Sequence, residues 1–515
     1  MRGKLLSALQ QRPYFLVLLP LFFIAHGYND LFGFFPFQFV LLNFITTLFA
    51  AALLYLTAAA LFKNKQKNAL FTFWLLLIIL AFGSIHDEFK KIFNAGFFSS
   101  YKFILPLILL AFILLFIYLK KKESAFSGFF RFLNLLFFIF LLYEFFSGIL
   151  NFIHYKKGSN LLDNRFTAVS QYRSKSFVPD SAKPDIYFLV FDAMPSTNAM
   201  KTSWNYDNSS LDSFLLKKGF YISKDSKSNY NLTVLSVSST LNMDYTPPIN
   251  LYQDETKMYF KASASILDNS LTKILQKEGY SISQYQPVSF NNKDWKGTLF
   301  FHDMLYMNYF YKTLPGRMYR DLGWNFSRLN LTFIKENAIS RYEKRNIESE
   351  RDLHKTIELV KGSCSLTNPK PQFVYAHFEL PHDPFVFDSA GNRKPTVETI
   401  QLTEEDQPNA FIEQVKFANH IIDTLVTHIK KSNKKNTVII IEGDHGFRNI
   451  YGKKGYMTFD NLNSIYYPDG DYRSHYPSIS PVNSFRVVLN KFFAASMPLL
   501  KDSSIFIPYT LPGEK

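Results

Sequence analysis

The feature that most constrains this chain is a series of five apolar stretches, the first of them short, all of which lie before residue 157. A helix needs about 20 apolar residues to cross a bilayer, and most of the stretches approach or exceed that length. Buried core helices of a soluble protein are the alternative, but five such stretches in direct succession favour membrane spans. The stretches cover residues 13–28, 35–62, 69–86, 102–119 and 129–154.

The composition changes after Lys157, which predicts a separate domain outside the membrane. The chain has 515 residues and 56 Phe, and the Phe is concentrated in the first part. We predict a transmembrane domain of about five helices at 1–157, a polar connector at 158–183 and an outer domain at 184–515. Within the connector, residues 160–170 are expected to form one short helix along the membrane surface.

The basic residues of the short loops predict the orientation. The N-terminal segment and the second and fourth loops carry Lys and Arg, whereas the first loop has neither and the third is mixed. This pattern puts the N-terminus inside and, after five spans, everything from about Tyr155 outside. No small-residue cleavage site follows the first stretch, so we expect a retained anchor. We interpret the chain as bacterial and predict a multi-pass protein of the inner (cytoplasmic) membrane.

The net charge of +15 is explained by this topology. Residues 1–157 contribute +10 and the remainder +5, so nucleic-acid binding is not indicated. A mildly basic outer domain suits a surface of anionic lipids. Cys364 is the only cysteine, which excludes an intrachain disulfide and a CxxC site.

Three runs in the outer domain read as buried strands of a parallel sheet. Helical patterns at 210–218, 267–277, 346–361 and 409–430 alternate with these runs, which favours an α/β domain with a mainly parallel sheet between helices. Polar residues follow each run, where sites form in such sheets. The runs and the residues that follow them are Ile186 to Phe191 with Asp192, 372–380 with His382, and 436–446 with Asp444 and His445.

Taken singly, these polar residues have ordinary explanations. Asp192 suits a helix N-cap, and an Asp-His-Gly turn at Asp444 is commonly structural. Carboxylate and imidazole are nevertheless good ligands for a divalent metal. Thr233 follows the turn 228–231 at the predicted start of a helix of small residues, where an anion is favoured. A cap is the default reading, but metal coordination would turn its hydroxyl into a nucleophile.

Four motifs in order, PDIYFLVFDAM, SNYNLT, ELPHDPF and IIIEGDHG, resemble the alkaline phosphatase and sulfatase superfamily. With the five spans, the chain resembles the membrane-bound sulfatase-like phosphotransferases, which include lipoteichoic acid synthases and phosphoethanolamine or phosphoglycerol transferases. The resemblance covers about residues 183–490. It implies an alkaline phosphatase/sulfatase-type domain behind a bundle of transmembrane helices.

The resemblance also implies roles for individual residues. Asp192, Thr233, Asp444 and His445 match the metal ligands, and Thr233 is also the nucleophile. His382 matches a histidine that contacts the phosphate or sulfate of the substrate. His475 and Arg448 are further substrate-binding candidates, although a surface histidine is the commoner case for His475. His377 competes with His382, but its place within an apolar strand favours a structural role.

Type I sulfatases carry a Cys or Ser that is converted to formylglycine, and this chain has Thr233 at that position. Threonine cannot be converted, so the phosphotransferase branch is favoured. The expected reaction moves a phospholipid head group to an envelope glycan or lipid through a phospho-threonine. A phosphoester hydrolase and a non-catalytic membrane binding module remain alternatives.

The expected metal is Mn or Zn, in one or two copies. The sequence leaves several features open: the head group, the acceptor, the oligomeric state and the role of residues 285–345, including His302 and Asp303.

Overall fold

The computed structural model describes most of the chain, in segments separated by gaps. The described residues are 9–30, 32, 37–93, 96–123, 126–156, 166–173, 179, 182–246, 262–285, 310–328, 332–365, 370–403, 405–432, 436–447 and 459–507. Residues 157–165, which hold most of the predicted connector helix, lie outside them.

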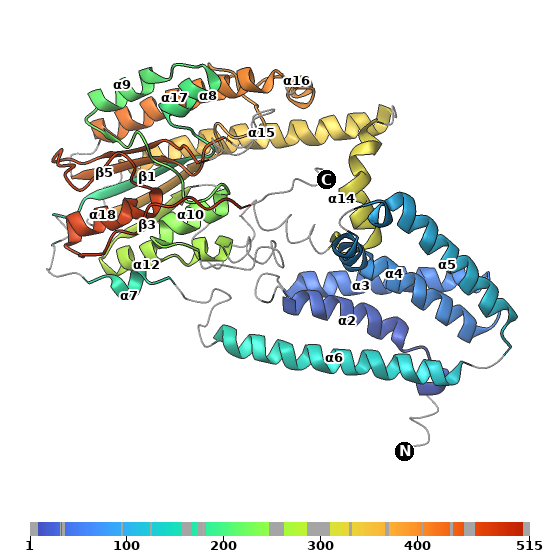
Figure 1. Ribbon diagram of the computed structural model, residues 1–515. Helices are drawn as coiled ribbons and strands as arrows, with labels where there is room; N and C mark the ends of the chain where they lie inside the picture. Colours follow the sequence, from blue (N-terminus) through green and yellow to red (C-terminus); the bar gives the residue numbers. More distant parts are fainter. Residues whose placement is uncertain are drawn as a thin grey trace. The chain divides into compact units, whose positions relative to one another are not determined.

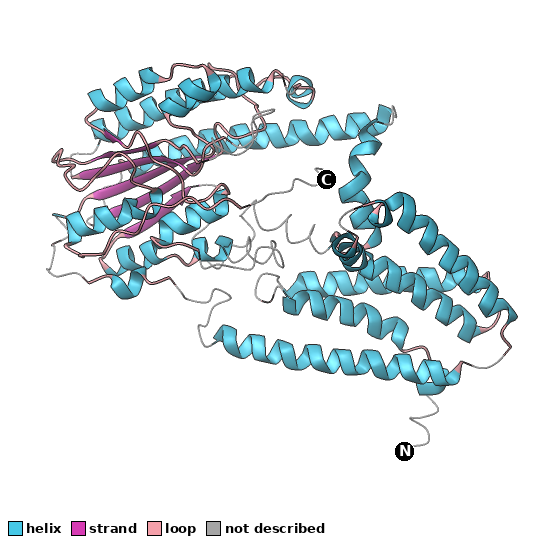
Figure 2. Ribbon diagram, in the orientation of Figure 1, coloured by secondary structure: helices cyan, strands magenta, loops and turns pink. Residues whose placement is uncertain are grey.

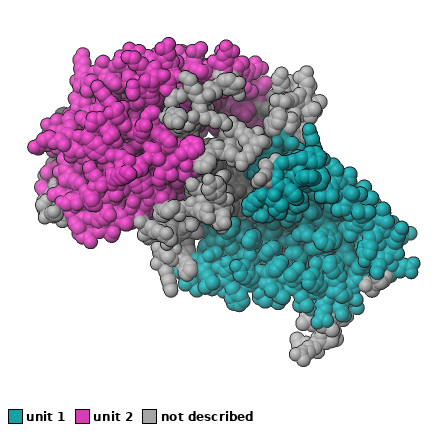
Figure 3. Space-filling view, in the orientation of Figure 1, with its two compact units in different colours: residues 1–163, 303–329, 510–515 teal, residues 164–302, 330–509 magenta. Residues whose placement is uncertain are grey.

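The chain divides into two compact units (Figure 3). The helical unit consists of residues 1–163, 303–329 and 510–515, and the sheet unit of residues 164–302 and 330–509. Our predicted outer domain ran without interruption from residue 184. The compact units differ from it, because residues 303–329 and 510–515 group with the helical unit and the sheet unit begins at residue 164.

The helical unit is built from long apolar helices (Figure 1). Asn64 caps the start of α4, since its side chain accepts the backbone N–H of Gln66 at 2.9 Å. The apolar helices are α2 (Phe15–Asp30), α3 (Phe37–Ala59), α4 (Lys65–Ile92), α5 (Tyr101–Lys121) and α6 (Ser127–Lys156). The more polar α14 (Leu314–Arg328) and a 3-10 turn at Phe97–Ser99 also belong to this unit.

Four helices among the described residues are long and apolar enough to cross a membrane, rather than the five predicted spans. These four are α3, α4, α5 and α6. The first apolar stretch forms α2, but this helix has 16 residues. At 1.5 Å per residue it is about 24 Å long, shorter than the roughly 30 Å hydrocarbon layer.

Polar side chains attach α2 to α6. Glu144 of α6 is 4% exposed, and its two carboxylate oxygens bind His26 Nδ1 and Asn29 Nδ2, each at 2.8 Å. Carboxylates inside membrane helices are tolerated when they are paired in this way. The short helix α2 is therefore held in the bundle by hydrogen bonds as well as by apolar packing.

The sheet unit alternates strands and helices, as the sequence predicts. Its predicted helices appear as α9, α12, the second half of α15 and α17. The elements are α7 (Ala168–Gln171), β1 (Asp185–Phe191), α8 (Thr197–Trp204), α9 (Ser209–Lys217), β2 (Tyr221–Ile222), α10 (Thr233–Asn242), α12 (Ser270–Lys277), β3 (Ser281–Tyr285), α15 (Thr332–Ser363), β4 (Gln372–Phe378), α16 (Thr396–Ile400), α17 (Gln407–Ser432), β5 (Thr437–Gly443), β6 (Asn463–Tyr466) and α18 (Pro481–Phe493).

The six strands form one mixed sheet in the order β2-β6-β5-β1-β4-β3. Strands β5, β1, β4 and β3 pair in parallel. At the other edge of the sheet, β6 pairs antiparallel with both β5 and β2. The predicted apolar runs form β1, β4 and β5, all of whose residues are buried. The predicted α/β fold is confirmed, with an antiparallel edge that the apolar runs did not reveal.

Helices cover both faces of this sheet (Figures 1 and 2). α9, α15 and α17 pack on one face, and α10, α12 and α18 pack on the other. Each face has its own apolar cluster, because alternate side chains of β1 point in opposite directions. The sheet is thus buried on both sides, which explains why its strands read as continuous apolar runs.

Gly443, the last residue of β5, meets the chain that leaves β1. A Cβ atom there would lie 2.1 Å from the carbonyl oxygen of Met194. The Gly443 N–H donates to Leu462 O at 2.8 Å, and the Leu462 N–H donates to Met194 O at 3.0 Å. This close approach fixes the position from which residues 444 and 445 continue.

We predict that Gly443→Ala destabilises the sheet unit by at least about 2 kcal/mol, because backbone must move to make room for the methyl group. Thermal unfolding of the purified protein in detergent would measure the loss. Gly362→Ala, in α15 where nothing lies within 4 Å of the added atom, is the matched control. It should be neutral or stabilise by up to about 1 kcal/mol. Equal effects of the two changes would contradict the role assigned to Gly443.

Candidate active site

The predicted site residues follow strands that end at the same edge of the sheet. Asp192 follows β1, and Asp444 with His445 follows β5. Phe191 lies opposite Gly443 in one strand pair and opposite Phe378 in the other. The Asp192 N–H then donates to Phe378 O at 2.9 Å, so it extends the pairing with β4 by one residue. Loops from three parallel strands therefore converge where α/β sheets carry their sites.

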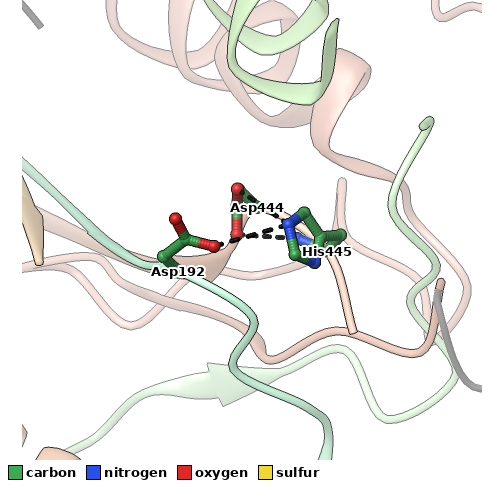
Figure 4. A group of neighbouring side chains, drawn as sticks. All are labelled: Asp192, Asp444 and His445. Atoms are coloured by element: carbon green, nitrogen blue, oxygen red, sulfur yellow. Dashed lines mark hydrogen bonds and ion pairs between the residues drawn. The ribbon is translucent and has the colours of Figure 1, made fainter. Parts of the chain in front are cut away.

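Asp192, Asp444 and His445 form a buried cluster (Figure 4). One atom from each residue lies within 4.8 Å of the others. His445 Nε2 is 3.4 Å from Asp192 Oδ1 and 3.4 Å from Asp444 Oδ2. The residues are 5%, 5% and 0% exposed, in chain order. Sequence reasoning named all three, and the structure brings them together.

Thr233 completes the group from the other side. It is the first residue of α10, and its hydroxyl oxygen lies within hydrogen-bond distance of His445 Nε2, at 3.2 Å. The start of a helix offers backbone N–H groups and the positive end of the helix dipole, which together favour an anion. The hydroxyl thus lies beside the carboxylate cluster and at a helix end suited to phosphate.

Backbone contacts orient Asp444 and His445. Asp444 Oδ1 accepts the N–H groups of Ala193 and His445, each at 2.9 Å. Ala193 adopts a left-handed conformation (φ 61°), which costs a non-glycine residue about 1 kcal/mol or more. His445 Nδ1 donates to Gly446 O at 2.6 Å, which fixes the ring with Nε2 on the side of the two carboxylates.

These contacts leave a site that fits a divalent cation. Asp192 Oδ1 and Asp444 Oδ2 are buried without a hydrogen-bond donor. Each lies 3.4 Å from His445 Nε2. Buried carboxylate oxygens cost free energy unless positive charge compensates them. Two carboxylates, an imidazole nitrogen and a hydroxyl match the ligands that zinc and manganese take in proteins.

Histidines around Asp192 add positive character. Burial by itself would raise the pKa of Asp192, but the charge of His382 and contact with His377 outweigh burial and hold that pKa below its ordinary value. Conversely, burial lowers the pKa of His377, and the neighbouring Asp192 outweighs it and raises that pKa. The pair favours an ionised Asp192.

His377 is a neighbour of the cluster that sequence reasoning set aside as structural. Its side chain is fully buried, with Nε2 3.8 Å from Asp192 Oδ2 and Nδ1 bonded to the Tyr375 hydroxyl at 2.9 Å. The β1–β4 register places it one residue before the partner of Phe191. Pairing this strand end with Asp192 would have been the signal that revealed it.

The other predicted residues lie in different places. His382 is partly exposed, its ring 6.3 Å from that of His445, and its Nδ1 donates to Asp383 O. Arg448 lies outside the described residues. His475 is not brought to the cluster. Its Nε2 binds the hydroxyl of Tyr467 at 2.8 Å, and Tyr467 directly follows β6. Because β6 runs antiparallel to β5, its end lies away from Asp444.

Sequence comparison supports the same assignment of fold. The profile of the sulfatase family matches residues 189–479, more than half of the chain. The chain belongs to the sulfatase family. It is accordingly an enzyme of sulfatase type that carries an N-terminal membrane region. No curated protein matches it in sequence.

Solved structures with similar arrangements include transferases and a sulfatase. The periplasmic domain of EptC from Escherichia coli is 11% identical and has a TM-score of 0.37, covering 63% of this chain and 90% of that one. The integral membrane lipooligosaccharide phosphoethanolamine transferase A from Neisseria meningitidis is 12% identical with a TM-score of 0.36, covering 95% of both chains. A Bacteroides thetaiotaomicron sulfatase of glycosaminoglycan metabolism is 11% identical with a TM-score of 0.37, covering 61% and 74%.

The burial of His475 is expected to make the stability of the protein depend on pH. Burial, with Lys491 nearby, lowers the pKa of His475 to about 4 from 6.5. The unfolded chain therefore takes up this proton first as pH falls. The stability that neutral His475 contributes is present above pH 6.5 and is lost toward pH 4.

Between pH 6.5 and pH 4, we expect the free energy of unfolding of the sheet unit to fall by about 3 kcal/mol more in the unaltered protein than in the His475→Gln variant. Unfolding midpoints of the protein and of His475→Gln, compared at about pH 7 and about pH 4.5, measure the difference. Parallel pH dependences would show that His475 is not buried as described.

Proposed function

We propose that this enzyme transfers the phosphate head group of a membrane phospholipid, of phosphoethanolamine or phosphoglycerol type, to a hydroxyl of an envelope glycan or lipid. We further propose that the protein resides in the bacterial inner membrane with its sheet unit outside the cytoplasm. One observation carries the reaction class: the Thr233 hydroxyl lies 3.2 Å from a nitrogen of the carboxylate–imidazole cluster, at the N-terminus of α10.

In the proposed first step the Thr233 oxygen attacks the donor phosphorus. A bond forms between Thr233 Oγ1 and phosphorus, and the bond from phosphorus to the diacylglycerol oxygen breaks. The proton of the Thr233 hydroxyl ends on the oxygen of the released diacylglycerol. In the second step the acceptor hydroxyl attacks the phospho-threonine, and Thr233 regains its proton. Splitting one substitution into two in this way is nucleophilic catalysis.

The surrounding residues have separate parts in this proposal. Asp192, Asp444, His445 and Thr233 would hold a divalent metal, zinc or manganese. That metal would supply positive charge that lowers the pKa of the threonine hydroxyl and polarises a phosphoryl oxygen. The N–H groups at the start of α10 and the side chain of His382 would stabilise the negative charge of the phosphoryl group.

Threonine at position 233 argues against the chemistry of type I sulfatases. Their formylglycine is made from Cys or Ser, and a threonine side chain bears a methyl group where the aldehyde hydrogen would be. A phosphoester hydrolase remains the second candidate because water would replace the acceptor in the same second step. Product analysis with and without an acceptor glycan separates the two reactions.

We predict that Thr233→Ala abolishes both the covalent adduct and turnover, by about 1,000-fold or more. The full-length protein would be incubated with vesicles of phosphatidylethanolamine and phosphatidylglycerol, and the adduct located by mass spectrometry. Thr233→Ser, which keeps a hydroxyl, is the matched control and should still form an adduct. Unchanged turnover by Thr233→Ala would refute the proposed intermediate.

Metal removal gives an independent test of the cluster. A chelator should abolish turnover, and zinc or manganese should restore it. Asp444→Asn should weaken metal binding by about 100-fold or more, since it removes one charged ligand. Asp471→Asn is the control because Asp471 pairs with Arg473 at 2.8 Å, outside the cluster. Equal metal content in the two variants would argue against the proposed ligands.

A further inference from the structure

Residues 310–328 are an unexpected part of the helical unit. In the sequence they lie between β3 and α15, inside the region that matches the sulfatase family. In the structure they group with the membrane helices (Figure 3). A segment within the family's sequence region therefore belongs to the helical unit and not to the sheet unit.

The contact with α4 is close at Gly83. The Gly83 N–H donates to Lys312 O at 2.8 Å. A Cβ at Gly83 would lie 2.7 Å from Tyr311 O and 2.8 Å from the Cα of Lys312. Only glycine leaves room for backbone to approach a helix so closely. The contact is consequently specific to this position of α4.

Arg317 adds a charged attachment next to Gly83. It is 3% exposed, and its Nη2 binds Asp87 Oδ2 at 2.6 Å and Gly83 O at 3.1 Å. Its Nε donates to Tyr311 O at 3.2 Å. A buried guanidinium requires such partners, and removal of one leaves an uncompensated charge. Arg317 is therefore built for this place on α4 and would be poorly satisfied elsewhere.

A second polar contact attaches the segment to α5. The Tyr101 hydroxyl donates to Asp321 Oδ2 at 2.6 Å, and Arg320 Nε donates to Asp321 Oδ1 at 2.6 Å. His86 Nδ1 lies 4.0 Å from the same carboxylate. Two helices of the membrane region thus hold α14 through separate side chains.

These partners lie at one end of the membrane helices, the C-terminal end of α4 and the start of α5. Family sequence precedes and follows residues 310–328, so the segment is on the same side of the membrane as the catalytic sequence. The turn between α4 and α5 must then be on that side too. The loop charges predict the same side for this turn.

We propose that residues 310–328 are a membrane-docking segment, whose attachment to α4 and α5 is needed for action on a donor held in the bilayer but not for chemistry at Thr233. The inference rests on the proposed function. Its physical reason is that a lipid donor stays in the bilayer, so an enzyme acting on it must work at that surface. Only residues 329–331 separate α14 from α15, so docking of α14 restricts how far the catalytic sequence can move from these helices.

Two glycine variants of the full-length protein test this proposal. Gly83→Ala places a methyl group against residues 311 and 312, whereas Gly128→Ala, in α6, meets nothing within 4 Å and is the matched control. Arg317→Gln provides a second disruption that leaves the membrane helices unchanged. Docking is measured by hydrogen exchange of residues 310–328. Activity is measured on phosphatidylethanolamine vesicles and on a water-soluble phosphodiester, bis(p-nitrophenyl) phosphate.

We expect Gly83→Ala and Arg317→Gln to raise exchange in residues 310–328 and to lower the vesicle rate by about tenfold or more. The soluble-diester rate should stay within about twofold, as should both rates of Gly128→Ala. Three results would overturn the proposal. The first is raised hydrogen exchange in residues 310–328 with full activity on vesicles, and the second is unchanged exchange in these residues. The third is an equal loss of activity on vesicles and on the soluble diester. An unaltered enzyme inactive on both substrates would overturn the proposed function and, with it, this inference.

Discussion

The catalytic half of this protein is organised around negative charge that is buried at one edge of the sheet. Asp192 and Asp444 each present an oxygen to His445 without a hydrogen-bond donor of their own. Such a group is tolerated only where the fold prevents it from relaxing and a cation can compensate it. Several local features serve that end: the left-handed Ala193, the close approach at Gly443 and the helix start at Thr233.

Much of this arrangement follows from residues that a reader of the sequence can recognise. β1, β4 and β5 are continuous apolar runs because both faces of the sheet are covered, and parallel strands place the residues after them at one edge. Asp192, Asp444 and His445 were accordingly found from sequence. His377 was not assigned to the site, because an apolar strand does not show which of its residues faces the end of the next strand.

Other features depend on information that local patterns do not contain. His475 follows a short strand whose direction is invisible in sequence, and antiparallel pairing of β6 carries it away from the cluster. The first apolar stretch predicts a span, yet its helix ends at Asp30 after 16 residues. Its attachment to Glu144 could not be foreseen, since the partner is 118 residues away. Residues 310–328 likewise carry no local signal of the body against which they pack.

The membrane region is more than an anchor that could be exchanged for any apolar helix. Its helices carry polar groups matched to one another, as in His26 with Glu144, and to the catalytic sequence, as in Asp87 with Arg317. This division of labour has a practical consequence. A soluble version that begins after residue 157 would keep α14 but lose α4 and α5, so Arg317 would lose Asp87 and Asp321 would lose Tyr101. Such a fragment would expose a surface evolved for contact with helices, and removing residues 310–328 as well would give a better-behaved catalytic domain for crystallisation.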